Sequence, residues 1–324
     1  MATSISPTFP LERIGKKSQD ILDEVEKAVI GKRRFLEKVL CALLARGHVL
    51  IEDFPGLAKT LTARSFARVL GLQFKRIQFT PDLLPADVTG TYIFKRQQGE
   101  FELIKGPIFA NLVLGDEINR TPPKTQSAML EAMEEHQITL EGASLKLPQP
   151  FMVIATQNPI EYEGTFPLPE AQLDRFMLRL SVGYPAADEE FEVLKRYWER
   201  HQEEPDLGCL SHAEELNAMC TAVEYVRVDP DVARYMVSLV RASRERREIA
   251  VGASPRASLA LLKLSRAKAA LDGRDYVIPD DVKFFAREVF VHRLLLQPDM
   301  WVRELAVNDV VEDILRRTPV PRYP

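Results

Sequence analysis

A short polar loop between an apolar run and a helical pattern constrains the fold of this chain most strongly. Residues 48–51 form an apolar run typical of a short buried strand, and residues 60–70 have the pattern of a helix that ends at Gly71. Between them lies Asp53-Phe-Pro-Gly-Leu-Ala-Lys59-Thr60, which is close to the loops that turn backbone N–H groups toward phosphates. This order of strand, loop and helix predicts an α/β domain that binds a nucleotide.

The loop departs from the general phosphate-loop pattern at two positions, where Asp53 and Ala58 stand in place of glycine. Both residues keep the backbone N–H group on which phosphate binding depends. Gly56 remains where we expect a positive φ, and Pro55 stiffens the approach to it. The methyl group of Ala58 is tolerable if this position has ordinary helical backbone angles.

The loop and the first turn of the helix supply the predicted nucleotide ligands. Lys59 is expected to reach the β- and γ-phosphates of ATP, and the Thr60 hydroxyl to bind Mg²⁺. The alternative is an ordinary surface loop between a strand and a helix. The predicted nucleotide-binding residues of this segment are Phe54, Pro55, Gly56, Leu57, Ala58, Lys59, Thr60 and Leu61.

A second apolar run, residues 111–115, ends in the acidic pair Asp116 and Glu117. The carboxyl ends of parallel strands face the ligand crevice of an α/β sheet. Two carboxylates there would be costly without a partner, and Mg²⁺ is a natural partner for Asp116. Glu117 is then placed to activate water as a general base. The alternative is an acidic N-cap for a helix that begins near Pro122.

A third apolar run ends in Thr156-Gln157-Asn158, and Asn158 is a candidate for positioning the attacking water. A turn-forming asparagine before Pro159 is the competing interpretation. A phosphate loop, an acidic pair and a polar group, each at the end of a strand-like run, together predict hydrolysis of ATP with Mg²⁺ as cofactor.

Four further stretches strongly resemble the MoxR branch of the AAA+ ATPases, which belongs to the helix-2-insert group. The resemblance covers about residues 21–293. It implies an α/β fold, namely an AAA+ P-loop core with a parallel sheet flanked by helices, followed by a smaller all-helical lid domain. The four stretches are residues 76–87, 115–120, 155–159 and 167–176.

The resemblance also implies roles for residues outside the three motifs. Asn158 matches the first sensor, Arg175 matches an arginine finger that reaches a neighbouring subunit's nucleotide, and Arg256 matches the second sensor on the lid. For both arginines the alternative is a structural salt bridge. Gln78 is a candidate for restraining Glu117 until a substrate engages.

Three more segments are interpreted through the resemblance. Ile30 and Gly31 match the stretch that packs against adenine. Residues 91–104 alternate around Gln98-Gly99, and residues 136–147 alternate around Glu141-Gly142, so both are predicted hairpins. They match the insert in helix 2 and a hairpin before the sensor strand, both facing the centre of a ring. Two solvated hairpins that touch no substrate are the alternative.

The composition excludes several other classes of protein. The 324 residues suggest about two domains, and 46% apolar with 28% charged residues is typical of a soluble globular protein. A net charge of −4 does not favour nucleic acid as a partner. The sequence shows no membrane-spanning apolar run and no secretory signal. Its 3 cysteines are too few and dispersed for a disulfide framework, so we expect a cytoplasmic location.

The expected domain organisation has four parts: a flexible leader over residues 1–20, a nucleotide-binding α/β domain over 21–184, a helical lid over 185–317 and a tail over 318–324. Ser211 is a plausible N-cap for the second lid helix. Asp280 and Asp281 complement the dipole of the last one. The predicted lid helices are residues 188–202, 213–225, 230–247, 256–271 and 279–295.

The function predicted from these patterns is an ATP-hydrolysing motor that remodels or matures a client protein, including metal or cofactor insertion. The resemblance implies a ring of subunits, with six expected, and a client or adaptor that contains a von Willebrand factor type A domain. Two alternatives remain open at this point. One is a motor that remodels nucleic acid, and the other is a nucleotide-gated scaffold with little turnover.

Overall fold

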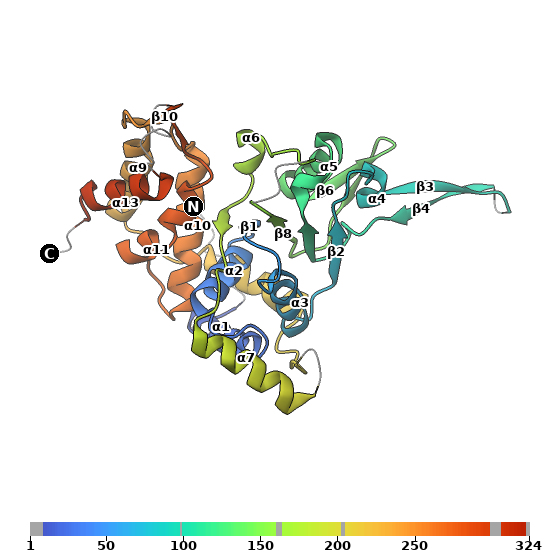
Figure 1. Cartoon of the computed structure of the whole chain (residues 1–324), viewed down its shortest axis with the longest axis horizontal. Coiled ribbons are helices and arrows are strands. Elements are labelled where there is room, and N and C mark those ends of the chain that lie inside the picture. Colours follow the sequence, from blue (N-terminus) through green and yellow to red (C-terminus); the bar gives the residue numbers. More distant parts are fainter. Residues whose placement is uncertain (1–8, 98, 160–163, 202–204, 299–305, 322–324) are drawn as a thin grey trace, which may run out of the picture.

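A five-stranded parallel sheet forms the centre of the first domain (Figure 1). The computed structural model describes residues 9–97, 99–159, 164–201, 205–298 and 306–321. The strand order is β2-β5-β8-β1-β9, so strands that are neighbours in space are distant in the chain. The strands are β1 (Val49–Glu52), β2 (Phe74–Gln78), β5 (Leu112–Asp116), β8 (Met152–Gln157) and β9 (Leu178–Leu180).

The parallel register brings the polar ends of the strands together. Gln78 pairs with Asp116 between β2 and β5, and Glu52 pairs with Gln157 between β1 and β8. β8 lies between β1 and β5, so the segments that follow all three strands meet at one edge of the sheet. The predicted functional residues lie in those segments.

Both faces of the sheet are covered, as expected for a parallel sheet whose strands are continuously apolar. Along β5, Leu112 and Leu114 belong to the core shared with the lid, whereas Val113 belongs to a second core on the opposite face. The first face packs on α1 (Leu11–Glu26), α2 (Arg33–Leu44) and α3 (Lys59–Val69). The second packs on α4 (Pro85–Thr89) and α5 (Pro123–Glu135).

The leader predicted over residues 1–20 is too long. Helix α1 begins at Leu11, and Ile14, Ile21, Leu22 and Val25 are buried on it. These positions follow the helical period, so their burial stabilises a helix that starts well before residue 21. Residues 1–8 lie outside the described part of the chain.

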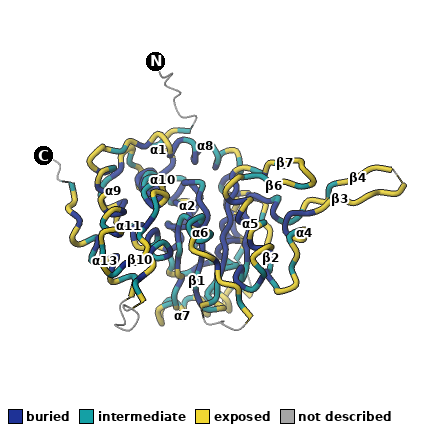
Figure 2. The backbone as a smooth tube through the Cα atoms, turned by 90° about the horizontal axis from the view of Figure 1, so that it is seen from above, coloured by how far each residue is buried: buried dark blue, intermediate teal, exposed yellow. Residues whose placement is uncertain are grey.

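Both predicted hairpins are present. The first consists of β3 (Gly90–Lys95) and β4 (Glu100–Lys105), paired antiparallel, and it projects from the body at the end opposite the lid (Figure 1). The second consists of β6 (Gln137–Leu140) and β7 (Ala143–Lys146). The first is largely exposed, whereas the buried backbone lies in the sheet and in the helices around it (Figure 2). Gln98, in the predicted first turn, lies outside the described residues.

In its described residues the second domain consists mainly of helices, and it also contains a two-stranded antiparallel ribbon of β10 (Ile249–Val251) and β11 (Leu295–Leu296). The last predicted helix, residues 279–295, is shorter in the structure. The observed helix stops at Phe290, and Leu295 pairs in β11 instead. Helix α13 was missed at the sequence level. The helices are α7 (Ala187–Arg200), α8 (Ala213–Val223), α9 (Pro230–Arg244), α10 (Pro255–Leu271), α11 (Pro279–Phe290) and α13 (Val307–Arg317).

The predicted N-cap at Ser211 is wrong. His212 is the N-cap residue of α8, and the Ser211 hydroxyl instead donates to Glu215 Oε2 at 2.8 Å. Asp280 and Asp281 do lie in the first turn of α11, as predicted. Among the residues described, no helix is both long and apolar enough to cross a membrane.

Candidate active site

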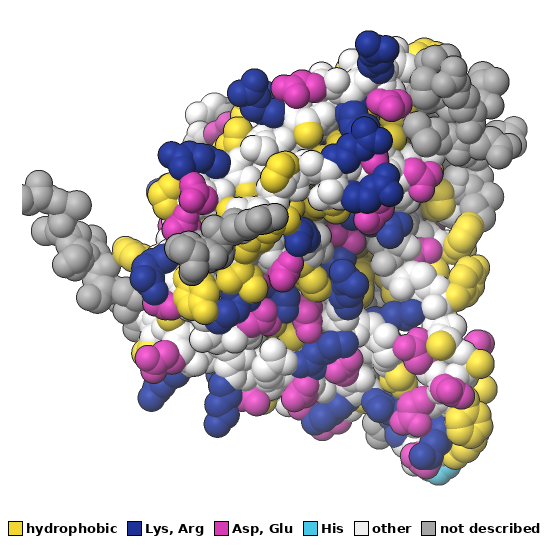
Figure 3. Space-filling model, turned by 90° about the vertical axis from the view of Figure 1, so that its left-hand side faces the viewer, with side chains coloured by type: hydrophobic (Ala, Val, Ile, Leu, Met, Phe, Trp, Pro, Cys, Tyr) yellow, Lys and Arg dark blue, Asp and Glu magenta, His cyan; other side chains and the backbone are white. Residues whose placement is uncertain are grey.

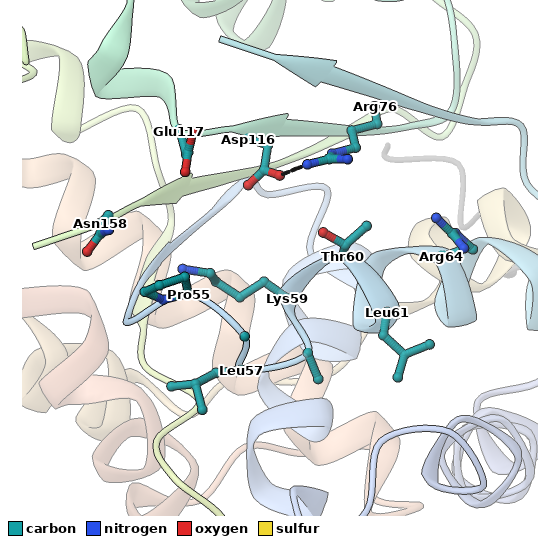
Figure 4. A pocket seen from close by; sticks show the side chains of 12 residues that line it. Pro55, Leu57, Lys59, Thr60, Leu61, Arg64, Arg76, Asp116, Glu117 and Asn158 are labelled. Atoms are coloured by element: carbon teal, nitrogen blue, oxygen red, sulfur yellow. Dashed lines mark hydrogen bonds and ion pairs between the residues drawn. The ribbon is translucent and has the colours of Figure 1, made fainter. Parts of the chain in front are cut away.

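A cavity of about 570 Å³ lies at the carboxyl edge of the sheet (Figure 4). The phosphate loop, residues 55–61, forms one side of it, and Asp116, Glu117 and Asn158 lie across from the loop. All three predicted motifs therefore meet in one cavity. Two arginines that the sequence did not single out, Arg64 on α3 and Arg76 on β2, also line it.

Two residues of the loop have left-handed or other positive-φ backbone. Gly56 has a φ of +83°, as its position in the loop predicts. Ala58 has a φ of 53° and a ψ of 20°, which is left-handed, so the condition of ordinary helical angles for its methyl group is not met. Left-handed backbone costs an L-residue about 1–2 kcal/mol. The loop bears this strain immediately before Lys59, the first residue of α3.

Asp53, the acidic departure from the phosphate-loop pattern, ties the loop to the segment that leads into the lid. Its Oδ2 accepts hydrogen bonds from the Ser181 hydroxyl at 2.8 Å and from the backbone N–H groups of Val182 and Gly183, both at 2.7 Å. Its Oδ1 accepts from the N–H of Phe54 at 2.9 Å. Burial alone would raise the pKa of this carboxyl, but these donors together lower it. This role of Asp53 was not predicted from the sequence.

The ammonium group of Lys59 lies in the cavity, where its Nζ donates to the backbone oxygen of Asp53 at 2.6 Å. Burial lowers the pKa of Lys59, and the nearby carboxylates of Asp53, Asp116 and Glu117 oppose that shift. A cation is therefore held among three carboxylates, within the loop that we expect to bind phosphate.

Hydrogen bonds hold the acidic pair at the end of β5. The Thr156 hydroxyl donates to Asp116 Oδ1 at 2.6 Å and accepts from the N–H of Glu117 at 2.9 Å. Glu117 has a φ of 57°, and its side chain makes no capping bond. The helix that follows, α5, has Pro122 as its N-cap residue, so Glu117 does not cap it.

Glu117 has two polar neighbours besides the backbone. Gln78 Nε2 donates to Glu117 Oε2 at 2.7 Å, which is the contact that the sequence reasoning anticipated. Arg120 Nη1 lies 3.2 Å from the same oxygen. The Glu117 carboxylate is thus held by the Gln78 amide from the edge strand β2 and by the Arg120 guanidinium from the turn that follows Glu117.

Arg175 and Arg256, which are 81 positions apart in the sequence, share one carboxylate. Glu134 on α5 lies 3.0 Å from Arg175 Nη2 through its Oε2, and 2.6 Å from Arg256 Nη2 through its Oε1. Arg175 Nη1 also donates to the backbone oxygen of Leu130 at 2.5 Å. Among the described residues that line the cavity, neither arginine appears. The structure brings the two arginines together but places them apart from this chain's own phosphate loop.

A buried ion pair anchors the segment that carries Arg175 to the lid. Arg293 Nε donates to Asp174 Oδ1 at 2.6 Å, and the Ser254 hydroxyl donates to Asp174 Oδ2 at 2.9 Å. The Arg293 side chain is only 3% exposed, so its partner is essential to its placement. The sequence analysis assigned no role to either member of the pair.

The two residues predicted to contact adenine lie beside the segment between the domains. Gly31 has a φ of +70° and lines a separate cavity of about 250 Å³ together with Ser181 and Val182. Ile30 is half-buried next to it. A methyl group at Gly31 would lie 2.2 Å from the Glu189 carboxylate, so only glycine fits there without movement.

Comparisons with known proteins agree with this geometry. The profile described as "ATPase family associated with various cellular activities (AAA)" matches residues 48–178, and that of the "AAA lid domain" matches residues 241–314. "Uncharacterized protein YeaC" of Bacillus subtilis is 46% identical over 300 residues, which cover 93% of each chain. "Chaperone MoxR1" of Mycobacterium tuberculosis is 42% identical over 311 residues, covering 92% of this chain and 81% of that protein.

A solved structure extends the similarity to three dimensions. It is described as a "putative ATPase" from Cytophaga hutchinsonii, is 37% identical, and superposes with a TM-score of 0.89 over 96% of this chain and 97% of that one. Identity at this level over both domains reflects common descent as well as a common fold. ATP hydrolysis is therefore the activity of this protein, which belongs to the MoxR family of AAA+ ATPases.

Proposed function

We propose that this ATPase uses Mg²⁺ and ATP to remodel or mature a client protein. The observation that carries the proposal is the cavity in which Lys59, Asp116, Glu117 and Asn158 come together from separate segments. The name of the relative from Mycobacterium tuberculosis, a chaperone, supports the same kind of role.

The side chains of the cavity fit a magnesium nucleotide. Mg²⁺ prefers hard oxygen ligands and is usually held by one or two carboxylates together with substrate phosphates. Asp116 offers a carboxylate, and the Thr60 hydroxyl, on the first turn of α3, faces the same cavity (Figure 4). Bound Mg²⁺ would neutralise charge on the transferring phosphoryl group.

The residues of the chain then have distinct tasks. Lys59 binds the β- and γ-phosphates, and the N-terminus of α3 adds its own partial positive charge. Glu117 accepts the proton of the attacking water, and Asn158 orients that water. Ile30 and Gly31 pack against adenine beside the segment that joins the two domains.

We further propose that the site is completed by a neighbouring subunit in a ring of six. Arg175 and Arg256 are held by Glu134, away from the phosphate loop of their own chain. Arginine suits a finger because its planar fork stays charged and binds phosphate bidentately. Such a finger accelerates phosphoryl transfer by about 10³–10⁵-fold.

The projecting β3–β4 hairpin is the proposed contact with the client. Ile93, Phe94, Phe101 and Ile104 are all exposed on it, and Phe101 is 70% exposed. Phe94 and Phe101 are paired across the two strands, and exposed apolar side chains of this kind mark sites of protein interaction. The family resemblance supports a client or adaptor with a von Willebrand factor type A domain, in the cytoplasm, and metal or cofactor insertion as one form of maturation.

The alternative of a nucleic-acid remodeller has less support. Residues 136–147, which include the second hairpin, contain a single lysine, whereas nucleic acid is bound through clustered basic side chains. On the lid-side face, basic and acidic side chains are interspersed (Figure 3). A scaffold with little turnover is separated from a motor by measuring ATP hydrolysis per subunit over a range of protein concentrations.

Two matched substitutions test the proposal. Glu117→Gln should keep ATP binding but lose turnover by about two to four orders of magnitude. Lys59→Ala should instead weaken binding itself. The ATP-loaded Glu117→Gln protein should retain a client in a pull-down that Lys59→Ala does not. Glu131→Gln, on the exposed side of α5, is the control. Equal loss of nucleotide affinity in both variants would refute the assignment of Glu117 as the base.

A further inference from the structure

Arg76 forms an ion pair with the carboxylate to which the proposed function assigns the metal. It extends from β2 into the cavity, and it donates to Asp116 Oδ2 from Nε at 3.1 Å and from Nη2 at 2.6 Å (Figure 4). The other oxygen of Asp116 accepts from Thr156. The Asp116 side chain is 13% exposed and that of Arg76 is 48% exposed, so the guanidinium can withdraw toward solvent.

The same guanidinium contacts the residue that holds the general base. Arg76 Nη2 also donates to Gln78 Oε1 at 2.6 Å, and Gln78 Nε2 donates to Glu117 Oε2 at 2.7 Å. Arg76 and Gln78 are two positions apart on one strand, so their side chains lie on the same face of the sheet. A continuous chain of hydrogen bonds therefore joins Asp116 to Glu117 through Arg76 and Gln78.

Arg76 and Glu117 together fix which way the amide of Gln78 points. An amide can present either its oxygen or its NH₂ group to a neighbour, and the surrounding network decides which. Arginine is a donor only, so it must receive the oxygen. The NH₂ group is then directed to Glu117 and donates to its carboxylate. This bond occupies a lone pair that Glu117 needs in order to accept a proton from water.

We propose that Arg76 is a positioning residue that competes with Mg²⁺ for Asp116, and that its withdrawal lets Gln78 release Glu117. This inference rests on the proposed function, because it needs Asp116 as the metal ligand. Both lone pairs of Oδ2 face the two N–H groups of Arg76, so a cation approaching that oxygen meets a like charge already in place. When Arg76 leaves, Gln78 loses the charged donor that fixes its amide and can release the base.

The first test is the metal dependence of nucleotide binding, which requires no turnover. Binding of a non-hydrolysable ATP analogue is titrated by calorimetry in EDTA and at a series of free Mg²⁺ concentrations. In Arg76→Met the Mg²⁺ concentration for half-maximal tightening of analogue binding should fall about two- to fivefold, the range that corresponds to a partly exposed ion pair. Affinity in EDTA should stay unchanged. Lys75→Met removes an exposed charge from the same strand and is the control.

The second test separates competition at Asp116 from the effect on Gln78. Arg76→Lys keeps a cation beside Asp116. A single ammonium group, however, cannot bond Asp116 and Gln78 together as the guanidinium of Arg76 does. The Mg²⁺ dependence of Arg76→Lys should resemble that of the parent, while its basal turnover rises, as it should in Arg76→Met. At saturating Mg²⁺, where competition at Asp116 no longer limits the rate, neither substitution should raise turnover further in a Gln78→Ala background, because the remaining effect acts through the contact of Gln78 with Glu117.

Three results would overturn the inference. Weaker analogue binding in EDTA by Arg76→Met would make Arg76 a phosphate ligand. An unchanged Mg²⁺ response would exclude competition, and a rise in turnover that persists in Gln78→Ala at saturating Mg²⁺ would exclude the route through Gln78. If the parent protein itself showed no tightening with Mg²⁺, the proposed metal site would fail together with this inference. Failure in the variants alone leaves the proposed function intact.

Discussion

Replacing Asp53 should loosen the phosphate loop from the segment that leads to the lid. The general pattern has glycine at this position, so Asp53→Gly would be harmless if the loop acted only through its backbone. The structure predicts the opposite, because Oδ2 accepts from Ser181, Val182 and Gly183. Asp53→Asn keeps the shape of the side chain and removes its charge, which makes it the milder change.

The contacts set the expected magnitude. A hydrogen bond to a charged group contributes about 1.5–3 kcal/mol, compared with about 1 kcal/mol for a neutral one. The amide of asparagine can present its oxygen to the three donors, but its NH₂ group then faces the N–H of Phe54. We expect Asp53→Asn to lower the free energy of unfolding by about 2–4 kcal/mol and Asp53→Gly by about 3–5 kcal/mol, since buried donors are left without an acceptor.

The pH dependence has a definite sign. The pKa of Asp53 in the folded protein is below its usual value of 3.8, despite the burial that opposes this shift. Its contribution is therefore complete above the unfolded pKa, and it is lost as the pH falls through the folded pKa. The stability difference between the parent protein and Asp53→Asn should stay constant from pH 8 to pH 5 and shrink only below about pH 4.

Thermal unfolding followed by calorimetry tests this prediction. For a domain of this size, 1 kcal/mol corresponds to a shift in Tm of about 2–4 °C, so Asp53→Asn should unfold about 4–16 °C lower. Asp53→Gly should unfold at a lower temperature still. A glycine variant as stable as the parent, or more stable than the asparagine variant, would refute the assigned role of the carboxylate.

Three other predictions concern the shared site, the strained loop and the hairpin. Mixing Arg175→Ala with Glu117→Gln subunits, each inactive alone, should restore some ATP turnover, because some interfaces then join an intact Glu117 to an intact Arg175. Turnover per subunit that is independent of protein concentration, as for a monomer, would contradict this. Ala58→Gly should raise Tm by about 1–3 °C, since glycine adopts a φ of 53° without the steric penalty of alanine; a lower Tm would contradict the strain argument. Phe101→Ser should weaken client capture by the Glu117→Gln protein while leaving basal turnover unchanged, and capture at the parent level would exclude the hairpin as the contact.

The sequence by itself determined the elements and the motifs, because both depend on residues that are close along the chain. An apolar run, a loop with Gly56 and Lys59, and a helical pattern specify strand, phosphate loop and helix through local backbone preference and period. Asp116 and Asn158 could be placed at strand ends by the same reasoning. The parallel arrangement then required those ends to meet at one edge. The helix before residue 21 followed the same period, but the prediction did not extend the pattern far enough.

Only the tertiary structure decided which distant residues became partners. The bond from Asp53 to Gly183 spans 130 positions, and Arg175 and Arg256 share Glu134 because the fold brings α5, the segment after β8 and the first turn of α10 together. The neighbours of a strand depend on a sheet order, β2-β5-β8-β1-β9, that local patterns do not encode. The left-handed backbone of Ala58 is likewise imposed by the loop around it, since alanine alone would avoid that conformation.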